Sequence, residues 1–321
     1  SEVMIKRLIL LLTTMFTINL AQAAPLTIGY SDWPGWVAWE VGIEKGWFEE
    51  AGVDVRFEWF DYVASMDAYA AGQLDAVCMT NGDALVTGAT GRRSTMAIIN
   101  DFSNGNDMIV ARPGITSVAE LAGKKVAVEI GFVGHLLLLR ALEKAGLTED
   151  DIELVNVRTN ETPMVLASGE VDAIVAWQPN SSQSLQMVPG STAIYSSAND
   201  QGLIYDTLAI APESLDQYPE QWGKVIEVWY RIVDFINDPA TSAAAVEIMA
   251  ARVGVAPDKY AQFMKGTRLL VKAEAMARYS ATEDLGSLGG STMVADSFNM
   301  KYKVYNTPQS ADDYISDVLY K

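Results

Sequence analysis

Two short stretches of the chain repeat one pattern 97 residues apart. "AAGQLDAVCMT" begins at residue 70 and "ASGEVDAIVAW" at residue 167. Aligned at Gly72 and Gly169, both read small-x-Gly-polar-aliphatic-Asp-Ala-aliphatic. Each predicts a helix that ends at a glycine and leads into a short buried strand.

The repeat extends upstream of both glycines. In the first copy, the strand "LTIGY" precedes a helix from about Val37 to "EEAG", and then the strand "VDVRFEWF". In the second copy, the strand "KKVAVEIG" precedes a helix from about Phe132 to "EKAG", and then "IELVNV". Strands that alternate with helices predict an α/β chain with two parallel or mixed sheets and flanking helices.

Two strand-like segments that end in proline are expected to join the two units. They are "NDMIVARP" (106–113) and "LIYDTLAIAP" (203–212). If the chain leaves at the first and returns at the second, the second unit is inserted in the first. The predicted lobes are therefore residues 24–109 with 206–321, and residues 110–205, joined by a two-strand hinge. The later segment "QWGKVIEVWYRIVDFIND" predicts an amphipathic helix, stopped by Asp238-Pro239.

The first 23 residues have the pattern of a secretory signal peptide. Lys6 and Arg7 precede the apolar run "LILLLTTMFTINL", which is followed by "AQA". That run is short for a membrane span, so cleavage near Ala23 and a periplasmic protein are expected. The single cysteine, Cys78, excludes an internal disulfide and is expected to be a buried small hydrophobe.

The charge of the chain is strongly acidic, with 41 Asp and Glu against 23 Lys and Arg. Loss of residues 1–23 removes two positive charges and one negative charge, which changes the formal net charge from −18 to −19. Nucleic-acid binding needs a basic surface, so we expect no nucleic-acid partner. An acidic surface also suits a protein from a salty habitat, and that alternative stays open.

In open α/β sheets, ligands bind beyond the carboxyl ends of the strands. Side chains that follow those ends are predicted to form a cleft between the lobes. From the first unit these are Asp32, Trp33, Trp36, Trp59, Asp61, Asn81 and Asp83. From the second they are Glu129, Phe132, His135, Trp177 and Gln178.

The order of these motifs resembles a known family. "WEVGIEKGWFEEAGVDV", the paired "GQLDAV" and "GEVDAI", and "SVAELAGKKVAVEIG" resemble the periplasmic solute-binding proteins of ABC importers of the nitrate/sulfonate/taurine type. "SDWPGW", "WFDYVASM", "TNGDA", "NGNDMIV" and "AWQPN" further resemble the urea-carboxylase-associated subgroup. The resemblance implies a two-lobed periplasmic-binding-protein fold of type II that closes on a small ligand. It also implies a monomer without cofactor or metal that delivers its ligand to a membrane permease and, through it, a cytoplasmic ATPase.

The charge of the predicted cleft favours a cation as the ligand. Its loops carry Asp32, Asp61, Asp83, Glu129 and Glu161 but no expected Lys or Arg. Carboxylates beside tryptophans suit a small organic cation through charge-assisted hydrogen bonds and cation–π contacts. A planar guanidinium fits best, and urea is its neutral analogue. The alternative is an anion such as an alkanesulfonate, taurine or nitrate, bound by the same fold.

Structural roles compete with several of these assignments. Asp32 and Asp83 are candidate helix caps, Asn81-Gly82 is a candidate turn, and His135 a structural histidine. Glu129, at the end of a strand, is able to point either way. Core packing is expected for Trp39, Trp47, Trp222 and Trp229. The glycine-rich "LGSLGGST" (285–292) lacks the lysine of a phosphate loop and is expected to be flexible.

An enzyme is the remote alternative, because some relatives of this fold act in thiamine-pyrimidine synthesis. Nucleophilic catalysis needs a nucleophile beside a base. The one cysteine is expected in mid-strand, and the one histidine belongs to the other lobe. Metal-ligand spacing is also missing from a sequence with one histidine and one cysteine. We therefore expect a binding protein and no catalytic residues.

Overall fold

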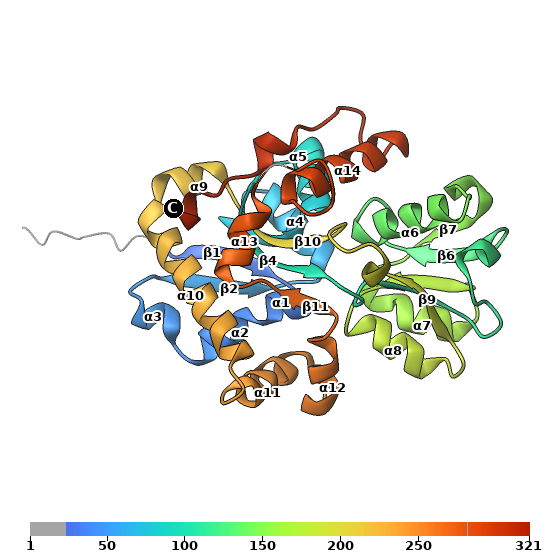
Figure 1. Ribbon diagram of the computed structural model, residues 1–321, viewed down its shortest axis with the longest axis horizontal. Coiled ribbons are helices and arrows are strands. Elements are labelled where there is room, and N and C mark those ends of the chain that lie inside the picture. The colour runs from blue at the N-terminus through green and yellow to red at the C-terminus, as the bar shows by residue number, and fades with distance from the viewer. Residues whose placement is uncertain (1–23, 281) are drawn as a thin grey trace, which may run out of the picture.

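A computed structural model describes residues 24–280 and 282–321 of the chain. The predicted signal peptide, residues 1–23, lies outside the described residues. The described chain forms two lobes, each a β-sheet with helices on both faces (Figure 1). This confirms the predicted two-lobed α/β fold.

The first lobe is built on a six-stranded mixed sheet with the strand order β11-β4-β10-β3-β1-β2. Its strands are β1 (Leu26–Tyr30), β2 (Val55–Trp59), β3 (Ala76–Thr80), β4 (Thr95–Ser103), β10 (Tyr205–Ile210) and β11 (Thr267–Leu269). β1 is parallel to β2 and β3, whereas β10 is antiparallel to both β3 and β4. Cys78 is fully buried in β3, as expected.

The second lobe is built on a five-stranded mixed sheet with the order β7-β6-β8-β5-β9. Its strands are β5 (Met108–Ala111), β6 (Lys125–Val128), β7 (Glu153–Asn156), β8 (Ala173–Ala176) and β9 (Thr192–Ser196). Side chains alternate between its faces. Val126, Val128 and Val175 pack in the core on the side of α6 (Val133–Lys144), and Val110 and Ile174 pack with Leu166 of α7 (Thr162–Ser168). Figure 1 shows these two helices on opposite faces of the sheet.

The second sheet is formed by a segment that lies between β4 and β10 of the first. The chain crosses through residues 104–107 and returns through residues 197–204. Hydrogen bonds join the two crossing segments to each other. The Ser103 and Ser197 hydroxyls lie 2.6 Å apart, and the Ser197 amide donates to the Asp107 carbonyl at 2.9 Å. The strand-like segments predicted at the crossings are β5 and β10, which belong to different sheets.

Helices cover both sheets. In the first lobe they are α1 (Pro34–Val37), α2 (Trp39–Glu44), α3 (Trp47–Glu50), α4 (Tyr62–Ala70), α5 (Asn81–Thr90), α9 (Pro212–Gln217), α10 (Pro219–Asn237), α11 (Ser242–Val253), α12 (Pro257–Phe263), α13 (Lys272–Arg278) and α14 (Leu288–Lys301). In the second lobe they are α6 (Val133–Lys144), α7 (Thr162–Ser168) and α8 (Asn180–Met187). Short 3-10 helices are η1 (Val118–Leu121), η2 (Glu149–Asp151), η3 (Thr159–Glu161), η4 (Ser197–Asn199), η5 (Ala311–Tyr314) and η6 (Val318–Tyr320).

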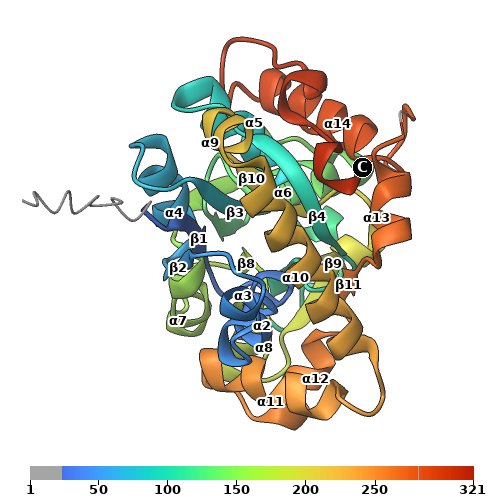
Figure 2. The same cartoon turned by 90° about the vertical axis from the view of Figure 1, so that its left-hand side faces the viewer.

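The predicted amphipathic helix is α10, which runs beside α2 and α11 (Figure 2). The four tryptophans assigned to packing are buried, as predicted: Trp39, Trp47, Trp222 and Trp229. The glycines that mark the repeat both adopt positive φ, 79° at Gly72 and 89° at Gly169. They end α4 and α7 in the left-handed conformation that glycine tolerates best.

Two local predictions were wrong. The single helix expected from Val37 is instead the three short helices α1, α2 and α3, with a break at Ala38 and a second at Gly46, whose φ of 69° ends the helical path between α2 and α3. The segment expected to be flexible, 285–292, contains the start of α14. There the Ser287 hydroxyl accepts from the Gly290 amide at 2.9 Å and caps the helix.

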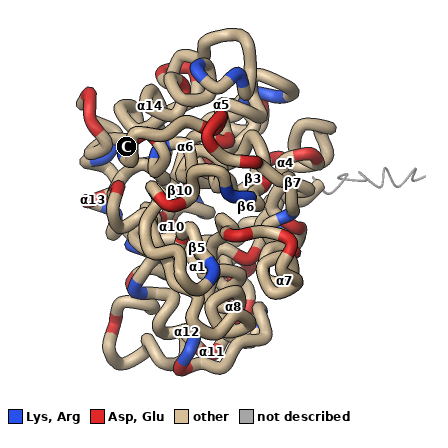
Figure 3. Tube along the Cα trace, turned by 90° about the vertical axis from the view of Figure 1, so that its right-hand side faces the viewer, with Lys and Arg blue, Asp and Glu red and all other residues tan. Residues whose placement is uncertain are grey.

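Within residues 24–280 and 282–321, every helix is too short or too polar to cross a membrane. Acidic positions lie on many segments of the chain, with basic positions interspersed (Figure 3). Some of the basic side chains form ion pairs, as Arg140 does with Asp200 at 2.8 Å. In this view the acidic positions are distributed over several segments rather than gathered on one.

Candidate functional site

The lobes meet at a cleft that holds an outer and an inner cavity. The outer cavity measures about 420 Å³. The inner cavity is far smaller, about 10 Å³, and lies behind the rings of Tyr62 and Trp177, which line both. Those two rings meet edge to face with centroids 5.3 Å apart. They form the wall between the two cavities, one ring from each lobe.

Four aromatic rings surround the inner cavity. Trp33 precedes α1 and Trp36 lies within it. Pro34 begins this helix shortly after the end of β1, which places both indoles at the carboxyl end of that strand. Tyr62 begins α4 and stacks on Trp36 at a centroid distance of 5.4 Å. Trp177 follows β8 and approaches from the second lobe. All four rings are at most 6% exposed, and the indole nitrogen of Trp36 is buried without a partner.

Three aspartates lie beside these four rings, which we call the aromatic cage. Asp206 is the second residue of β10, and its register places it opposite Thr80 of β3 and Asp101 of β4. Asp107 lies on the outgoing crossing, just before β5. Asp206 and Asp107 line the inner cavity. Asp101 lies behind Trp33, whose indole N–H donates to both of its oxygens at 3.1 and 3.2 Å.

These carboxyl groups are buried without a cationic partner. No Lys or Arg is among the described residues that line the inner cavity. Asp101 and Asp206 are register partners on the neighbouring strands β4 and β10, and Oδ2 of Asp206 is buried without a partner. Burial raises the pKa of Asp107 to about 7. Burial, and then the charge of Asp101, raises the pKa of Asp206 well above its ordinary value.

Asp32 and Asp83 connect the two lobes. The Trp177 indole N–H donates to Asp32 Oδ1 at 2.9 Å, and the Asn180 amide donates to Oδ2 at 3.3 Å. The Tyr62 hydroxyl donates to Asp83 Oδ2 at 2.6 Å, and the Val133 amide at the start of α6 donates to the same oxygen at 3.2 Å. Burial raises the pKa of Asp32 to about 6 and of Asp83 to about 7.

The capping alternatives for these two residues were wrong. The cap of α5 is Thr80, whose hydroxyl accepts from the Asp83 amide at 3.1 Å. Trp33 holds the cap position of α1, without a side-chain hydrogen bond. The turn expected at Asn81-Gly82 is instead the first turn of α5.

The remaining predicted site residues fall into two groups. The outer cavity is lined by Trp59, Asp61, Glu129 and Phe132, together with Asp32 and Trp177. Glu129 accepts from the Thr159 amide at 3.0 Å and hydroxyl at 2.6 Å, and burial raises its pKa. Arg158 also lines this cavity. The expectation of a cleft without a basic residue was therefore wrong for its outer part.

Asn81, His135 and Gln178 line neither cavity, and their polar atoms are used inside the protein. The Asn81 amide donates to Ser291 at 2.9 Å, and its oxygen accepts from the Tyr205 amide at 3.1 Å. His135 Nδ1 accepts from the Gly131 amide at 3.0 Å, and Nε2 lies 2.9 Å from Glu149. Gln178 Oε1 accepts from the Ser182 amide at 3.0 Å. For His135 this geometry matches the structural alternative.

The sequence-based prediction missed the innermost acids, Asp101, Asp107 and Asp206. It considered only carboxyl ends of strands in the repeated units. β10 is antiparallel to β3 and therefore brings its amino end, with Asp206, to the same edge of the sheet. The available signal was the pair of acids inside the segments predicted to cross between the lobes, "NDMIVARP" and "LIYDTLAIAP".

No cluster of three or more His, Cys, Asp or Glu residues suited to a metal ion occurs in the described parts of the chain. The inner cavity presents the carboxyl groups of Asp107 and Asp206 beside four aromatic rings. That donor set suits an organic cation through hydrogen bonds and cation–π contact.

Comparison with known proteins places the chain in a family. The model of the NMT1/THI5-like family matches residues 34–241. A candidate binding protein of Brucella abortus (strain 2308) is 28% identical over 314 residues, which cover 96% of this chain and 95% of that protein. The taurine-binding periplasmic protein of Escherichia coli K12 is 26% identical over 176 residues, 53% of each chain.

Solved structures share the fold at low identity. The periplasmic aliphatic sulphonate binding protein SsuA from Escherichia coli superposes with a TM-score of 0.76 at 18% identity, over 93% of this chain and 99% of that one. The desulfurization enzyme DSZB superposes with a TM-score of 0.64 at 16% identity, over 92% and 97%. Since the family model covers well over half of its length, this chain belongs to the NMT1/THI5-like family, and its fold is that of the periplasmic binding proteins.

Proposed function

We propose that this protein is the periplasmic solute-binding component of an ABC importer. It captures a small organic cation of the guanidinium type between its lobes and delivers it to a membrane permease that a cytoplasmic ATPase drives. Support comes from the family, from a relative named as a binding protein and from the two-lobed fold. The ligand is inferred from the chemistry of the inner cavity.

The observation that carries the choice of ligand is a set of buried acids inside an aromatic cage. Asp107 and Asp206 line a cavity walled by Trp33, Trp36, Tyr62 and Trp177, with no basic side chain among the described lining residues. An uncompensated buried carboxylate costs several kcal/mol. A cation in this cavity supplies the missing charge, and the rings add about 0.5–2 kcal/mol each through cation–π contact.

Shape and size favour a flat, small ion. In the closed arrangement the inner cavity has about 10 Å³ free, close to the space that one buried water needs. A ligand of few heavy atoms needs only a small shift of the rings. A guanidinium presents N–H groups in its plane to carboxylates, while its face stacks on an indole.

The alternative ligand is an anion. A relative is named as taurine-binding and a structural neighbour as sulphonate-binding, which supports this alternative. Anions favour helix N-termini with free amides. Here the Val133 amide at the start of α6 is taken by the Asp83 carboxylate at 3.2 Å. An anion in the inner cavity would also face Asp107 and Asp206, so we favour the cation.

The first test is a calorimetric titration of residues 24–321 with guanidinium, urea, choline, taurine, an alkanesulfonate and nitrate. The proposal expects micromolar or tighter binding of guanidinium and weaker or no binding of the anions. Asp206→Asn should weaken guanidinium binding at least about tenfold, because one charge-assisted hydrogen bond is lost. Asp312→Asn, at an exposed acid remote from both cavities, is the matched control. Tight binding of an anion, with none of guanidinium, overturns the proposed ligand.

We also propose that the protein binds without catalysis. One structural neighbour is an enzyme, so the point needs its own test. Cys78 is fully buried in β3, and burial raises the pKa of its thiol. His135 is held by Gly131 and Glu149. Incubation of the bound ligand, followed by NMR of the released solute, should return it unchanged; a new product would show turnover.

A further inference from the structure

Asp101 and Asp206 form a carboxyl pair at the floor of the inner site. Their positions are register partners on β4 and β10, next to a register shift between Asp206 and Thr207. They are 0% and 2% exposed. Side chains of register partners on antiparallel strands stand on the same face of the sheet, with Cβ atoms about 4.5–5.5 Å apart. Two carboxylates that close in a buried site repel each other strongly, which favours one proton held by the pair.

The surroundings of the pair contain more negative charge and no compensating cation. Asp107 on the crossing and Asp83 on α5 both raise the pKa of Asp206 through their charge. The Trp33 indole donates to Asp101 from α1, and Cys78 on β3 lies buried beside it with a raised thiol pKa. Arg278 lies 5.3 Å from the ring of Phe102, the next residue of β4, but bonds to the Tyr205 hydroxyl and the Gly286 carbonyl.

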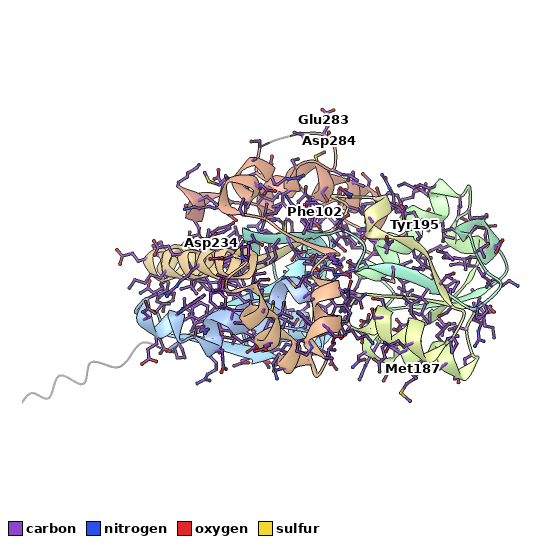
Figure 4. All side chains as sticks on the ribbon, turned by 60° about the horizontal axis from the view of Figure 1, so that its bottom comes forward. Phe102, Met187, Tyr195, Asp234, Glu283 and Asp284 are labelled. Atoms are coloured by element: carbon purple, nitrogen blue, oxygen red, sulfur yellow. The ribbon has the colours of Figure 1, made fainter. Side chains whose placement is uncertain are left out.

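The pair is joined to the cavity. Asp206 lines it, and its Oδ2 is a buried polar atom without a partner. The indole N–H of Trp36 is a second buried group without a partner in the same lining. Figure 4 labels Phe102, the residue that follows Asp101 in β4, near the middle of the molecule. An ion that enters the cage therefore comes close to the carboxyl group that shares the proton.

We propose that the inner site exchanges a proton for its cation, with the Asp101–Asp206 pair as the proton donor. This rests on the proposed function, because it assumes a cationic ligand. In the free protein one proton is shared between the two carboxyl groups, which together carry a charge of −1. When the cation binds, the shared O–H bond breaks and the proton passes to solvent. The cation's charge then replaces that of the proton, so the charge of the pair and its occupant stays at −1.

The electrostatic reason is that the cation and the shared proton compete for the same position beside the two carboxyl groups. Two carboxylates in contact in a buried site repel each other strongly, so one proton stays bound near neutral pH. A cation in hydrogen-bond contact with Asp206 gives the same relief without that proton. Burial raises the pKa of both acids in the free protein, and the charge of Asp101 raises that of Asp206 further, which agrees with a proton held by the pair.

The test is calorimetric titration of the mature protein with guanidinium chloride at pH 7 in buffers of different ionisation enthalpy. The dependence of the observed heat on the buffer gives the number of protons released. The proposal expects about one proton per guanidinium. It also expects an apparent Kd that weakens about tenfold for each unit of pH decrease where one proton is exchanged. Guanidinium binding with no proton released overturns the exchange but leaves the proposed function standing; no binding of guanidinium overturns both.

Two matched variants identify the source of the proton. Asp206→Asn replaces one carboxyl group of the pair with an amide, whose N–H can donate to Asp101 without a shared proton, so the release should fall by about one. Asp107→Asn removes another acid of the cavity but keeps the pair, so about one proton should still be released. Loss of the release in Asp107→Asn, with its retention in Asp206→Asn, overturns the assignment to the pair.

A readout on the free, unsubstituted protein does not depend on how well the variants fold or bind. Infrared difference spectra at pH 7 should show a protonated carboxyl band that disappears when guanidinium is added. Taurine should leave the band in place. A spectrum of the free protein without any protonated carboxyl band at pH 7 contradicts the proposal.

Discussion

At the scale of single residues, the site depends on one close approach of backbone to side chain. Gly35 lies in α1 between the two tryptophans, and a Cβ built on it would lie 1.8 Å from Asp101 Oδ2. Only glycine lets this turn come so close to the carboxyl group that Trp33 holds. The "SDWPGW" loop was predicted as a wall of the cleft, but nothing local in it indicates contact with Asp101.

Gly35→Ala should therefore displace the Asp101 carboxyl group. We expect about 1–3 kcal/mol of destabilisation, as for other overpacked cores, and guanidinium binding weakened at least about tenfold. Urea denaturation and calorimetry measure the two effects. Gly223→Ala in α10 is the control, since its Cβ would meet nothing within 4 Å and alanine improves a helix by about 0.5–1 kcal/mol. Equal behaviour of the two variants would contradict the role given to Gly35.

At the scale of elements, the position of α5 depends on its cap. The Thr80 hydroxyl accepts from the Asp83 amide at 3.1 Å, and Asp83 is thereby placed to accept from Tyr62 and from Val133 of the second lobe. The end of β3, the start of α5 and the start of α6 thus meet at one carboxylate. This meeting was not predictable from the sequence, because capping preference alone assigned the cap to Asp83.

Thr80→Ala should cost about 0.5–2 kcal/mol in the free energy of unfolding of the ligand-free protein, since the cap is lost. Thr80→Ser keeps a hydroxyl at the same place and should recover most of that loss. Urea denaturation of the two variants beside the unsubstituted protein measures the difference. If serine is as destabilising as alanine, the lost methyl group rather than the cap is responsible.

At the scale of the whole molecule, closure is held by hydrogen bonds from first-lobe carboxylates to the second lobe. Asp32 binds Trp177 and Asn180, and Asp83 binds Val133. The described structure is a closed arrangement, and we expect hinge motion at the crossings, residues 104–107 and 197–204. Asp32 and Asp83, predicted as ligand-binding residues, are thus placed to hold the lobes together around the ligand.

Asp32→Ala should weaken closure because it removes the acceptor for both Trp177 and Asn180. In small-angle scattering with saturating guanidinium, the unsubstituted protein should show a smaller radius of gyration than without it. Asp32→Ala should show a reduced or absent decrease. Asp312→Ala, exposed and away from the cleft, should behave as the unsubstituted protein. Identical curves with and without ligand for the unsubstituted protein would contradict a hinged trap.

Stability of the ligand-free protein should decrease as pH rises. Burial raises the pKa of Asp32 to about 6 and of Asp83 and Asp107 to about 7, so the folded state binds more protons than the unfolded chain. Their contribution is fully present below pH about 4, and is lost as pH rises through 6 to 7. Urea midpoints without cation should be lower at pH 8 than at pH 5.5. Carboxyl groups whose pKa is lowered in the folded protein, such as Glu143, change its stability only as pH falls below their ordinary pKa near 4.5. They therefore do not affect the comparison between pH 5.5 and pH 8. A higher midpoint at pH 8 would contradict the burial of these acids as neutral groups.

The sequence by itself determined the local and modular features of this protein. Hydrophobic periodicity and helix-ending glycines gave the two units, the long helix α10 and the buried Cys78, because these features depend on neighbours along the chain. Trp33, Trp36 and Trp177, predicted at the cleft from their places after strand ends, line the inner cavity.

Only the tertiary structure decided which acids meet. Asp101, Asp107 and Asp206 are far apart in sequence, and they converge because β10 runs antiparallel between β3 and β4 while the crossing carries Asp107 to the same edge. Strand direction and register arise from long-range pairing, which no local pattern encodes. For the same reason, Asn81, His135 and Gln178 were placed in the predicted cleft, although their hydrogen bonds lie within the protein.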